Sequence, residues 1–180
     1  MNSGKRFENS IKNSIPLYCL YYRLPDPSQA FNKNDKLRFS RKNPCDIFLF
    51  DSIARLFYSI ELKTTKNGIF TFEDINIDEK QPSKMIHKHQ IVALEDFSKF
   101  NNLISGFIFN FRYEKQNTEI TYFQSISDFL IMANTINKKS FNEKDLLRYN
   151  PININGYKKR VNYTWDIDTF LLYQKEKYFT

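Results

Sequence analysis

The sequence has little of the residues that define several protein classes. Its 180 residues include two cysteines, four glycines and one tryptophan. Cys19 and Cys45 are isolated thiols, too few for a disulfide framework or a zinc cluster, and we interpret both as small apolar residues. The longest apolar runs, such as 47–50 and 106–109, are far shorter than the ~20 residues of a membrane-spanning helix. The first residues lack the apolar stretch of a signal peptide, so we expect a cytoplasmic protein with no membrane partner.

Aromatic side chains and positive charge are abundant instead. Phe and Tyr number 18 and 11, aromatic residues make up 17% of the chain, and the formal net charge is +7. Hydrophobic residues at 41% and charged residues at 26% are close to globular averages, so we predict one domain over residues 1–180 with a real core. The charge indicates an anionic partner, although biased nucleotide composition in the source genome would also enrich Lys, Asn, Ile, Phe and Tyr.

Part of the positive charge is concentrated at residues 28–43, a stretch without periodicity that follows Pro25 and Pro27. We predict a stalk-like insertion there, and the alternative is a solvated loop with no role. Lys and Arg supply most of the sequence-independent affinity for DNA, and rings such as Phe31 and Phe39 can stack on exposed bases. The candidate DNA contacts are Lys33, Lys36, Arg38, Arg41 and Lys42.

Apolar spacing and turn signals predict the other elements. Phe7, Ile11 and Ile15 repeat at helical spacing before Pro16, for example, which predicts a short amphipathic helix. The order of elements predicts an α/β fold with a mixed central sheet of about five strands flanked by helices. We expect helices at 5–15, 84–100, 127–136, 142–149 and 165–175, strands at 17–23, 46–50, 56–63, 106–113 and 119–123, and a polar linker at 67–83.

The strands at 46–50 and 56–63 are separated by a few turn-like residues, which predicts a hairpin. If its turn is centred between Ile53 and Ala54, residues whose numbers sum to 107 face each other, and Asp46 lies opposite Glu61. Opposed residues of an antiparallel pair have Cβ atoms ~4.5–5.5 Å apart, close enough for two carboxylates to share a cation. The strand period of two then directs Lys63 to the same face as Glu61. A slip of one residue would destroy this arrangement.

The helix predicted at 84–100 carries a polar side chain on its apolar face. Ser83 is a candidate N-cap, and Gln90 lies on the apolar stripe, where an inward polar group needs a partner. His87 and His89 are two residues apart, so on a helix they point away from each other, and we place both on the helix surface or beside the site. The stripe itself consists of Ile86, Ala93, Phe97 and Phe100.

Asp46, Glu61, Lys63 and Gln90 together fit metal-assisted phosphodiester hydrolysis. Carboxylate oxygens are natural ligands of Mg²⁺, which Mn²⁺ can replace, and the metal supports attack by water on a phosphate. A lysine beside the carboxylates can orient the water or stabilise charge in the transition state. Taken singly, each residue has an ordinary explanation: an exposed salt bridge, a polar strand start or a structural amide.

The order of these motifs resembles the PD-(D/E)xK nuclease superfamily, and more closely the RecU-like Holliday junction resolvases, in a compact form expected of a phage or prophage protein. Residues 4–8 (GKRFE) are similar to the family's opening helix, 61–66 (ELKTTK) to its catalytic strand and 87–91 (HKHQI) to its helix motif. Phe72, Asp74 and Ile75 stand where the family has a segment leading into that helix. The resemblance covers about residues 4–112.

The resemblance implies a role for each matching residue. Asp46, Glu61 and Gln90 would hold Mg²⁺ directly or through water, Lys63 would stabilise the transition state, and Glu8 would support the metal site. The fold would be restriction-endonuclease-like, with residues 28–43 as the stalk that enters the junction. The protein would be a homodimer that cuts branched DNA by paired symmetric nicks.

Two alternatives remain open beside a junction resolvase. One is a PD-(D/E)xK restriction or repair nuclease of other specificity. The other is a non-catalytic DNA-binding accessory protein of recombination that keeps the fold, against which the complete set of Asp46, Glu61 and Lys63 argues.

Overall fold

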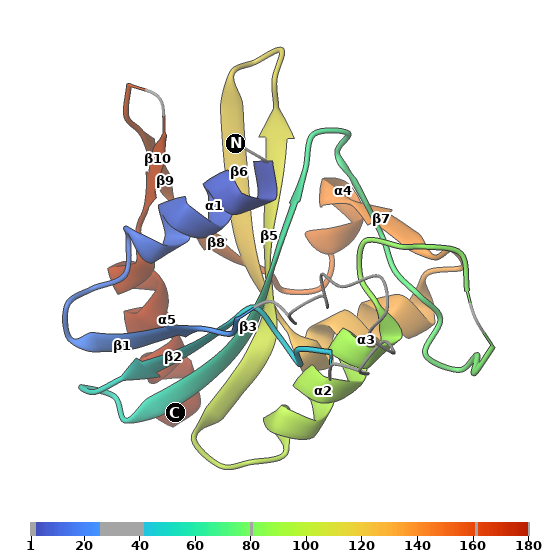
Figure 1. Cartoon of the computed structure of the whole chain (residues 1–180), viewed down its shortest axis with the longest axis horizontal. Coiled ribbons are helices and arrows are strands. Elements are labelled where there is room, and N and C mark those ends of the chain that lie inside the picture. The colour runs from blue at the N-terminus through green and yellow to red at the C-terminus, as the bar shows by residue number, and fades with distance from the viewer. Residues whose placement is uncertain (1–2, 26–41, 80, 161, 180) are drawn as a thin grey trace, which may run out of the picture.

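The computed structural model describes residues 3–25, 42–79, 81–160 and 162–179. Its centre is a mixed sheet of six strands in the order β1-β2-β3-β5-β6-β8 (Figure 1). Strands β3 and β5 pair in parallel, and all other neighbours in this sheet are antiparallel. The predicted mixed sheet flanked by helices is therefore confirmed. Its strands are β1 (Cys19–Arg23), β2 (Ile47–Asp51), β3 (Leu56–Thr65), β5 (Leu103–Tyr113), β6 (Thr118–Ser125) and β8 (Ile152–Ile154).

The hairpin of β2 and β3 has the predicted register. Ile47 faces Ile60 and Asp51 faces Leu56, so paired residue numbers sum to 107. The Asp51 carboxylate accepts hydrogen bonds from the backbone N–H groups of Ile53 and Ala54, at 2.8 and 3.0 Å. These bonds close the turn at the position on which the alignment of the two strands depends.

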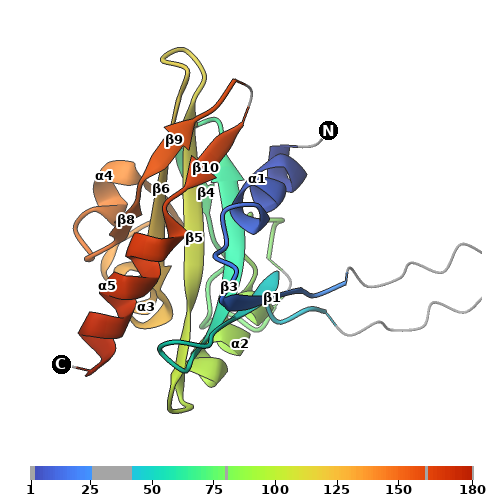
Figure 2. The same cartoon turned by 90° about the vertical axis from the view of Figure 1, so that its left-hand side faces the viewer.

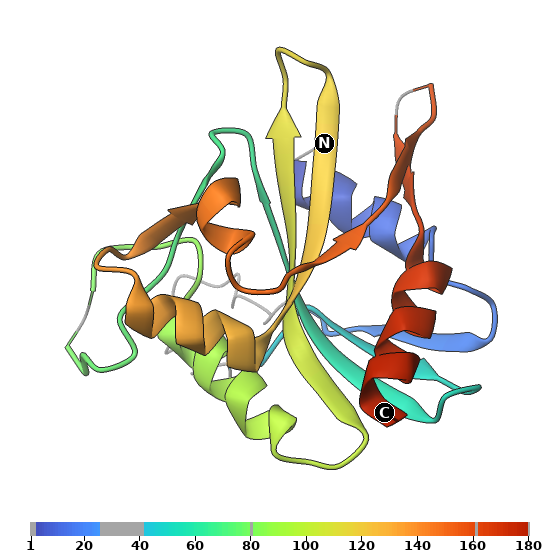
Figure 3. The same cartoon turned by 180° about the vertical axis from the view of Figure 1, so that it is seen from behind.

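Helices cover the two faces of the sheet and enclose two apolar clusters. Helices α1 (Ser3–Lys12) and α5 (Ile167–Phe179) contribute to the first cluster, with Phe7, Ile11 and Phe170 buried in it. Helices α2 (Lys88–Ser98) and α3 (Ile126–Thr135) pack against the second, and Figure 3 shows them side by side.

Most of the buried phenylalanines lie in the second cluster. Phe70, Phe107, Phe109, Phe129 and Phe141 are each at most 1% exposed, and their rings contact one another. Aromatic rings bury large areas and favour tilted and edge contacts of this kind. The core therefore accounts for part of the aromatic share of the sequence.

Two small sheets extend the fold beyond the helices and strands that the sequence predicts. Strand β4 (Ile69–Thr71) pairs with β7 (Ser140–Asn142), so the expectation of a polar linker at 67–83 is wrong. Phe70 and Phe72 are buried there, and periodicity misses them because the strand has three residues. Strand β9 (Gly156–Lys158) pairs with β10 (Tyr163–Trp165), which leads into α5 (Figure 2). The short helix predicted at 142–149 is α4 (Glu143–Leu146).

Helix α2 begins four residues later than predicted. Ile86 belongs to a bridge with Phe72 and donates its N–H to the Thr71 carbonyl at 3.0 Å, so the chain is still extended there. The N-cap is His87, not Ser83. The predicted apolar stripe is also wrong, since the buried residues of the helix are Ile91 and Leu94, and Phe100 beyond its end is 65% exposed.

The predicted insertion falls almost wholly outside the described residues. Of the candidate DNA contacts, Lys33, Lys36, Arg38 and Arg41 lie outside them, and Lys42 is described and exposed. No helix in the described part of the chain is long and apolar enough to cross a membrane.

Candidate active site

Asp46 is fixed against β3 by two hydrogen bonds. It directly precedes β2, and its N–H donates to the Ile60 carbonyl at 3.2 Å. Its Oδ2 accepts the Leu62 N–H at 2.8 Å. Asp46 therefore continues the hairpin pairing with its side chain and reaches the backbone on either side of Glu61.

Glu61 is the buried centre of the site, with 2% of its surface exposed. Lys63 lies on the same face, with its Nζ 2.8 Å from Glu61 Oε1. From α2, Gln90 Nε2 donates to the same oxygen at 2.5 Å. The sequence predictions that Lys63 shares the face of Glu61 and that Gln90 points inward are confirmed.

Burial dominates the electrostatics of the two acids. It raises the pKa of Glu61 to about 7, and the Asp46 charge adds to the rise while Lys63 opposes it. Burial also raises the pKa of Asp46, although the Leu62 N–H and the Lys63 charge lower it in part. The site thus holds two carboxyl groups that are difficult to ionise together without a further positive charge.

Asp46 and Glu61 fit a hard divalent cation. They offer oxygen donors at one point, and Mg²⁺ commonly binds one or two carboxylates and keeps several waters. The part of the chain described here contains no group of three or more His, Cys, Asp or Glu side chains placed to hold a metal. The Gln90 amide bonds Glu61 at one end and accepts the His87 N–H at 3.0 Å at the other, so its role as a ligand stays a prediction.

Glu8 lies near this pair but is bound elsewhere. It stands on α1, and its Oε2 accepts from Arg23 Nε at 3.0 Å. The charge of Glu8 contributes to the raised pKa of Asp46, so Glu8 is close enough to act on the site electrostatically. Its support of a metal site stays a prediction.

His87 and His89 are stacked, with ring centroids 5.5 Å apart and planes at 16°. The expectation that they point away from each other is therefore wrong, because His87 is an extended N-cap residue and the helical angle does not apply to it. Glu73 accounts for part of this arrangement: its Oε1 lies 3.0 Å from His87 Nδ1, and its Oε2 accepts the Lys88 N–H at 2.7 Å.

His89 is close enough to the site to be affected by its charges. Burial lowers the pKa of His89 to about 4, and the charges of Lys42, His87 and Lys63 add to the effect. The imidazole is therefore neutral at physiological pH. The Glu73 carboxylate reaches His87 from a different segment of the chain, so no spacing rule could have identified this contact.

No family model matches the chain. The SPbeta prophage-derived uncharacterized protein YotM of Bacillus subtilis (strain 168) is 31% identical to it over 176 residues. The match covers 91% of this chain and 82% of the relative.

Proposed function

The chain belongs to the same family as the SPbeta prophage-derived uncharacterized protein YotM. We propose that this chain is a metal-dependent endonuclease that resolves four-way DNA junctions. The observation that carries the proposal is the convergence of Asp46, Glu61 and Lys63 on one buried point. Charged groups are rarely buried together without a role, and perturbed carboxyl groups beside a cation are typical of catalytic sites.

The residues divide the chemistry between them. Asp46 and Glu61 would hold Mg²⁺, or Mn²⁺ in its place, which would supply the Lewis-acid charge for hydrolysis of a phosphodiester. The Lys63 ammonium would stabilise negative charge that develops on the phosphate. Gln90 holds Glu61 in place from α2, which limits the reorganisation of the acid during the reaction.

Junction specificity and the homodimer come from the resemblance to RecU-like resolvases. A chain with one such site cuts one strand at a time, so symmetric nicking of two strands requires a second copy. The prophage origin of the relative agrees with a phage or prophage protein that acts on DNA in the bacterial cytoplasm. Recombination and repair are the processes that such an enzyme would serve.

The test compares the wild type with Asp46→Asn and Glu61→Gln on four-way junction, linear duplex and single-stranded DNA, with and without Mg²⁺. We expect paired symmetric nicks on the junction by the wild type, and binding without cleavage by both variants. Asp96→Asn is the matched control, because Asp96 is exposed at the far end of α2 and should leave cleavage unchanged.

Other outcomes identify the alternatives. Equal cutting of linear duplex would replace junction resolution with a restriction or repair nuclease. If no DNA is cut and both variants bind like the wild type, the protein is a non-catalytic accessory protein. Deletion of residues 32–42, which lie almost wholly outside the described residues, should abolish junction preference if they form the stalk.

A further inference from the structure

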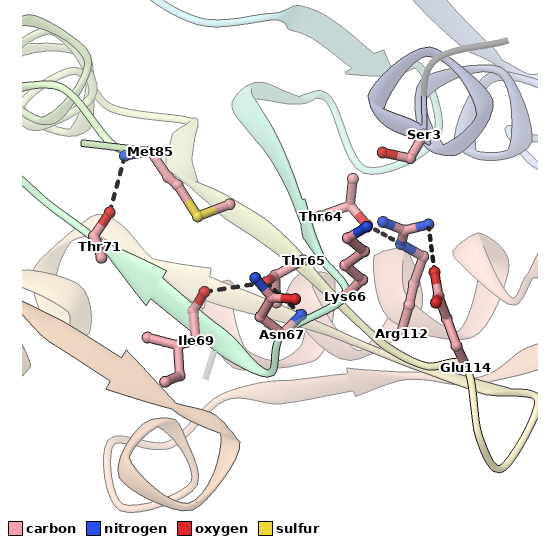
Figure 4. A pocket seen from close by; sticks show the side chains of 10 residues that line it. All are labelled: Ser3, Thr64, Thr65, Lys66, Asn67, Ile69, Thr71, Met85, Arg112 and Glu114. Carbon is pink, nitrogen blue, oxygen red and sulfur yellow. Dashed lines mark hydrogen bonds and ion pairs between the residues drawn. The ribbon is translucent and has the colours of Figure 1, made fainter. Parts of the chain in front are cut away.

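A polar cavity opens at the carboxyl end of β3. It has a volume of about 570 Å³ and lies where β3 turns into β4 (Figure 4). Thr64, Lys66, Arg112 and Glu114 contribute polar groups to its wall. It shares no lining residue with the candidate active site, and Lys66 is three residues beyond Lys63 along the chain.

The cavity continues the open edge of β3. Pairing with β2 ends at Ile60, whereas pairing with β5 continues to Thr65. Along the edge that β2 leaves free, the first N–H, from Leu62, donates to Asp46. Alternate residues of a strand direct their N–H groups to the same side, so the N–H of Thr64 faces this edge next. Glu61 and Lys63 face one side of the sheet and Thr64 faces the other, so a DNA strand would cross this open edge of β3 to pass from the candidate active site into the cavity.

Positive charge in this cavity is incompletely compensated. The Arg112 side chain is 13% exposed, and its Nε donates to Thr64 Oγ1 at 3.1 Å. Among the residues that the structure describes, its ion-pair partner is Glu114, 4.0 Å from Nη1 and 67% exposed. A distant, solvated acid neutralises a partly buried guanidinium poorly.

Lys66 adds a second cation to the same wall. It is exposed, and no described acid lies within ion-pair distance of its ammonium. Two cations beside one polar cavity favour an anion, and a guanidinium is suited to the oxygens of a phosphate.

We propose that this cavity binds a backbone phosphate of the DNA strand that occupies the active site. The inference rests on the proposed nuclease function and names a substrate contact of the same strand. Three residues of chain from Lys63 to Lys66 extend about 10 Å at strand geometry. DNA advances about 3.4 Å per nucleotide along its axis and the path of its backbone is longer, so the phosphate lies about one to three nucleotides from the bond that is cut.

The test measures DNA binding in EDTA, so that it does not depend on cleavage. Fluorescence anisotropy gives the affinity for junction DNA over a series of salt concentrations, for the wild type and for Lys66→Gln. Each phosphate contact contributes about 0.9 to the slope of log affinity against log salt on duplex DNA and about 0.7 on single strands. We expect the variant to bind more weakly and to lose about one contact from that slope.

Two controls make the result specific. Lys177→Gln removes the same charge from the last turn of α5, far from the turn between β3 and β4 (Figures 1 and 2), and should leave the slope unchanged. Lys66→Arg keeps the charge and should restore the slope. If Lys66→Gln has the slope of the wild type, or loses no more than Lys177→Gln, the inference is wrong.

A free phosphate is the other source of the same chemistry. Inorganic phosphate, added at constant ionic strength with sulfate as the control anion, should not displace the DNA if the cavity requires a polynucleotide. If phosphate displaces DNA from the wild type more than sulfate does, and Lys66→Gln differs from the wild type only in lacking this effect, the site binds a free anion. That result would overturn the inference. The cleavage test fails or succeeds independently, because Asp46→Asn and Glu61→Gln do not alter this cavity.

Discussion

Replacing Glu61 with glutamine should make the protein more stable at alkaline pH while removing the proposed nuclease activity. Glutamine keeps the shape of the side chain and offers a carbonyl oxygen to Gln90, but it carries no ionisable proton. The pKa of Glu61 is raised from 4.5 to about 7, so the folded state holds the proton more tightly than the unfolded state does. Stability contributed by the protonated acid is complete below the unfolded pKa, and it is lost as the pH rises toward 7.

The size of the effect follows from that rise. One pKa unit corresponds to about 1.4 kcal/mol, so ionised Glu61 lowers the free energy of unfolding by about 3 kcal/mol above pH 7. Screening by solvent reduces this energy little, because Glu61 is 2% exposed. The lowered pKa of His89 acts in the opposite direction, since its stability is lost as the pH falls, but it is present in both proteins and cancels in the comparison.

The assay is urea unfolding of the wild type and Glu61→Gln in EDTA, from pH 5 to pH 8. The two free energies of unfolding should diverge with rising pH, by about 3 kcal/mol in favour of the variant. Addition of Mg²⁺ should stabilise the wild type at pH 8 and not the variant, because a ligand that binds the folded state stabilises it. Parallel curves in EDTA would show that Glu61 is not held as a buried acid, and the electrostatic argument for the site would fail.

Three further predictions concern the surroundings of the site. Asn110→Ala removes a side chain of zero exposure that accepts from Thr64 at 2.7 Å, and urea unfolding should show a loss of about 1–3 kcal/mol. Gly106→Ala places a Cβ 2.3 Å from the Gln124 carbonyl oxygen, so β5 and β6 must separate, and the same assay should show a loss of about 1–3 kcal/mol, whereas wild-type stability would contradict the close approach. The ring protons of His89 should titrate near pH 4 by NMR, and a midpoint near 6.5 would show that its ring is solvated.

The sequence sufficed where local rules act on neighbouring residues. The register of β2 and β3 follows from a short turn, and Asp51 closes that turn with its own carboxylate. Once this register is set, the period of a strand places Asp46, Glu61 and Lys63 together. Gln90 was identifiable because an amide among apolar neighbours needs a polar partner inside the fold.

The sequence did not suffice where distant segments determine the local structure. The bridge of Ile86 with Phe72 keeps the chain extended, so α2 begins only after His87. Helix propensity depends on local sequence and cannot predict this pairing with a distant segment. Arg112 reaches Thr64 across the parallel pair of β3 and β5, 48 residues apart along the chain. A cavity built by such contacts has no signature in spacing, so its candidate phosphate contact could be found only from the folded arrangement.

The position of Glu61 is itself an argument for activity over a purely structural or DNA-binding role. The residue stands on an interior strand between Ile60 and Leu62, and its partner across the parallel pair is Phe107, which has zero exposure. An apolar side chain would pack there without the loss of about 3 kcal/mol that ionisation of Glu61 imposes. DNA binding alone needs surface cations, which this chain has in excess, and it gains nothing from a buried acid. A protein whose net stability is typically ~5–15 kcal/mol gives up a substantial part of it at this position, and the proposed catalysis at a metal site would account for that cost.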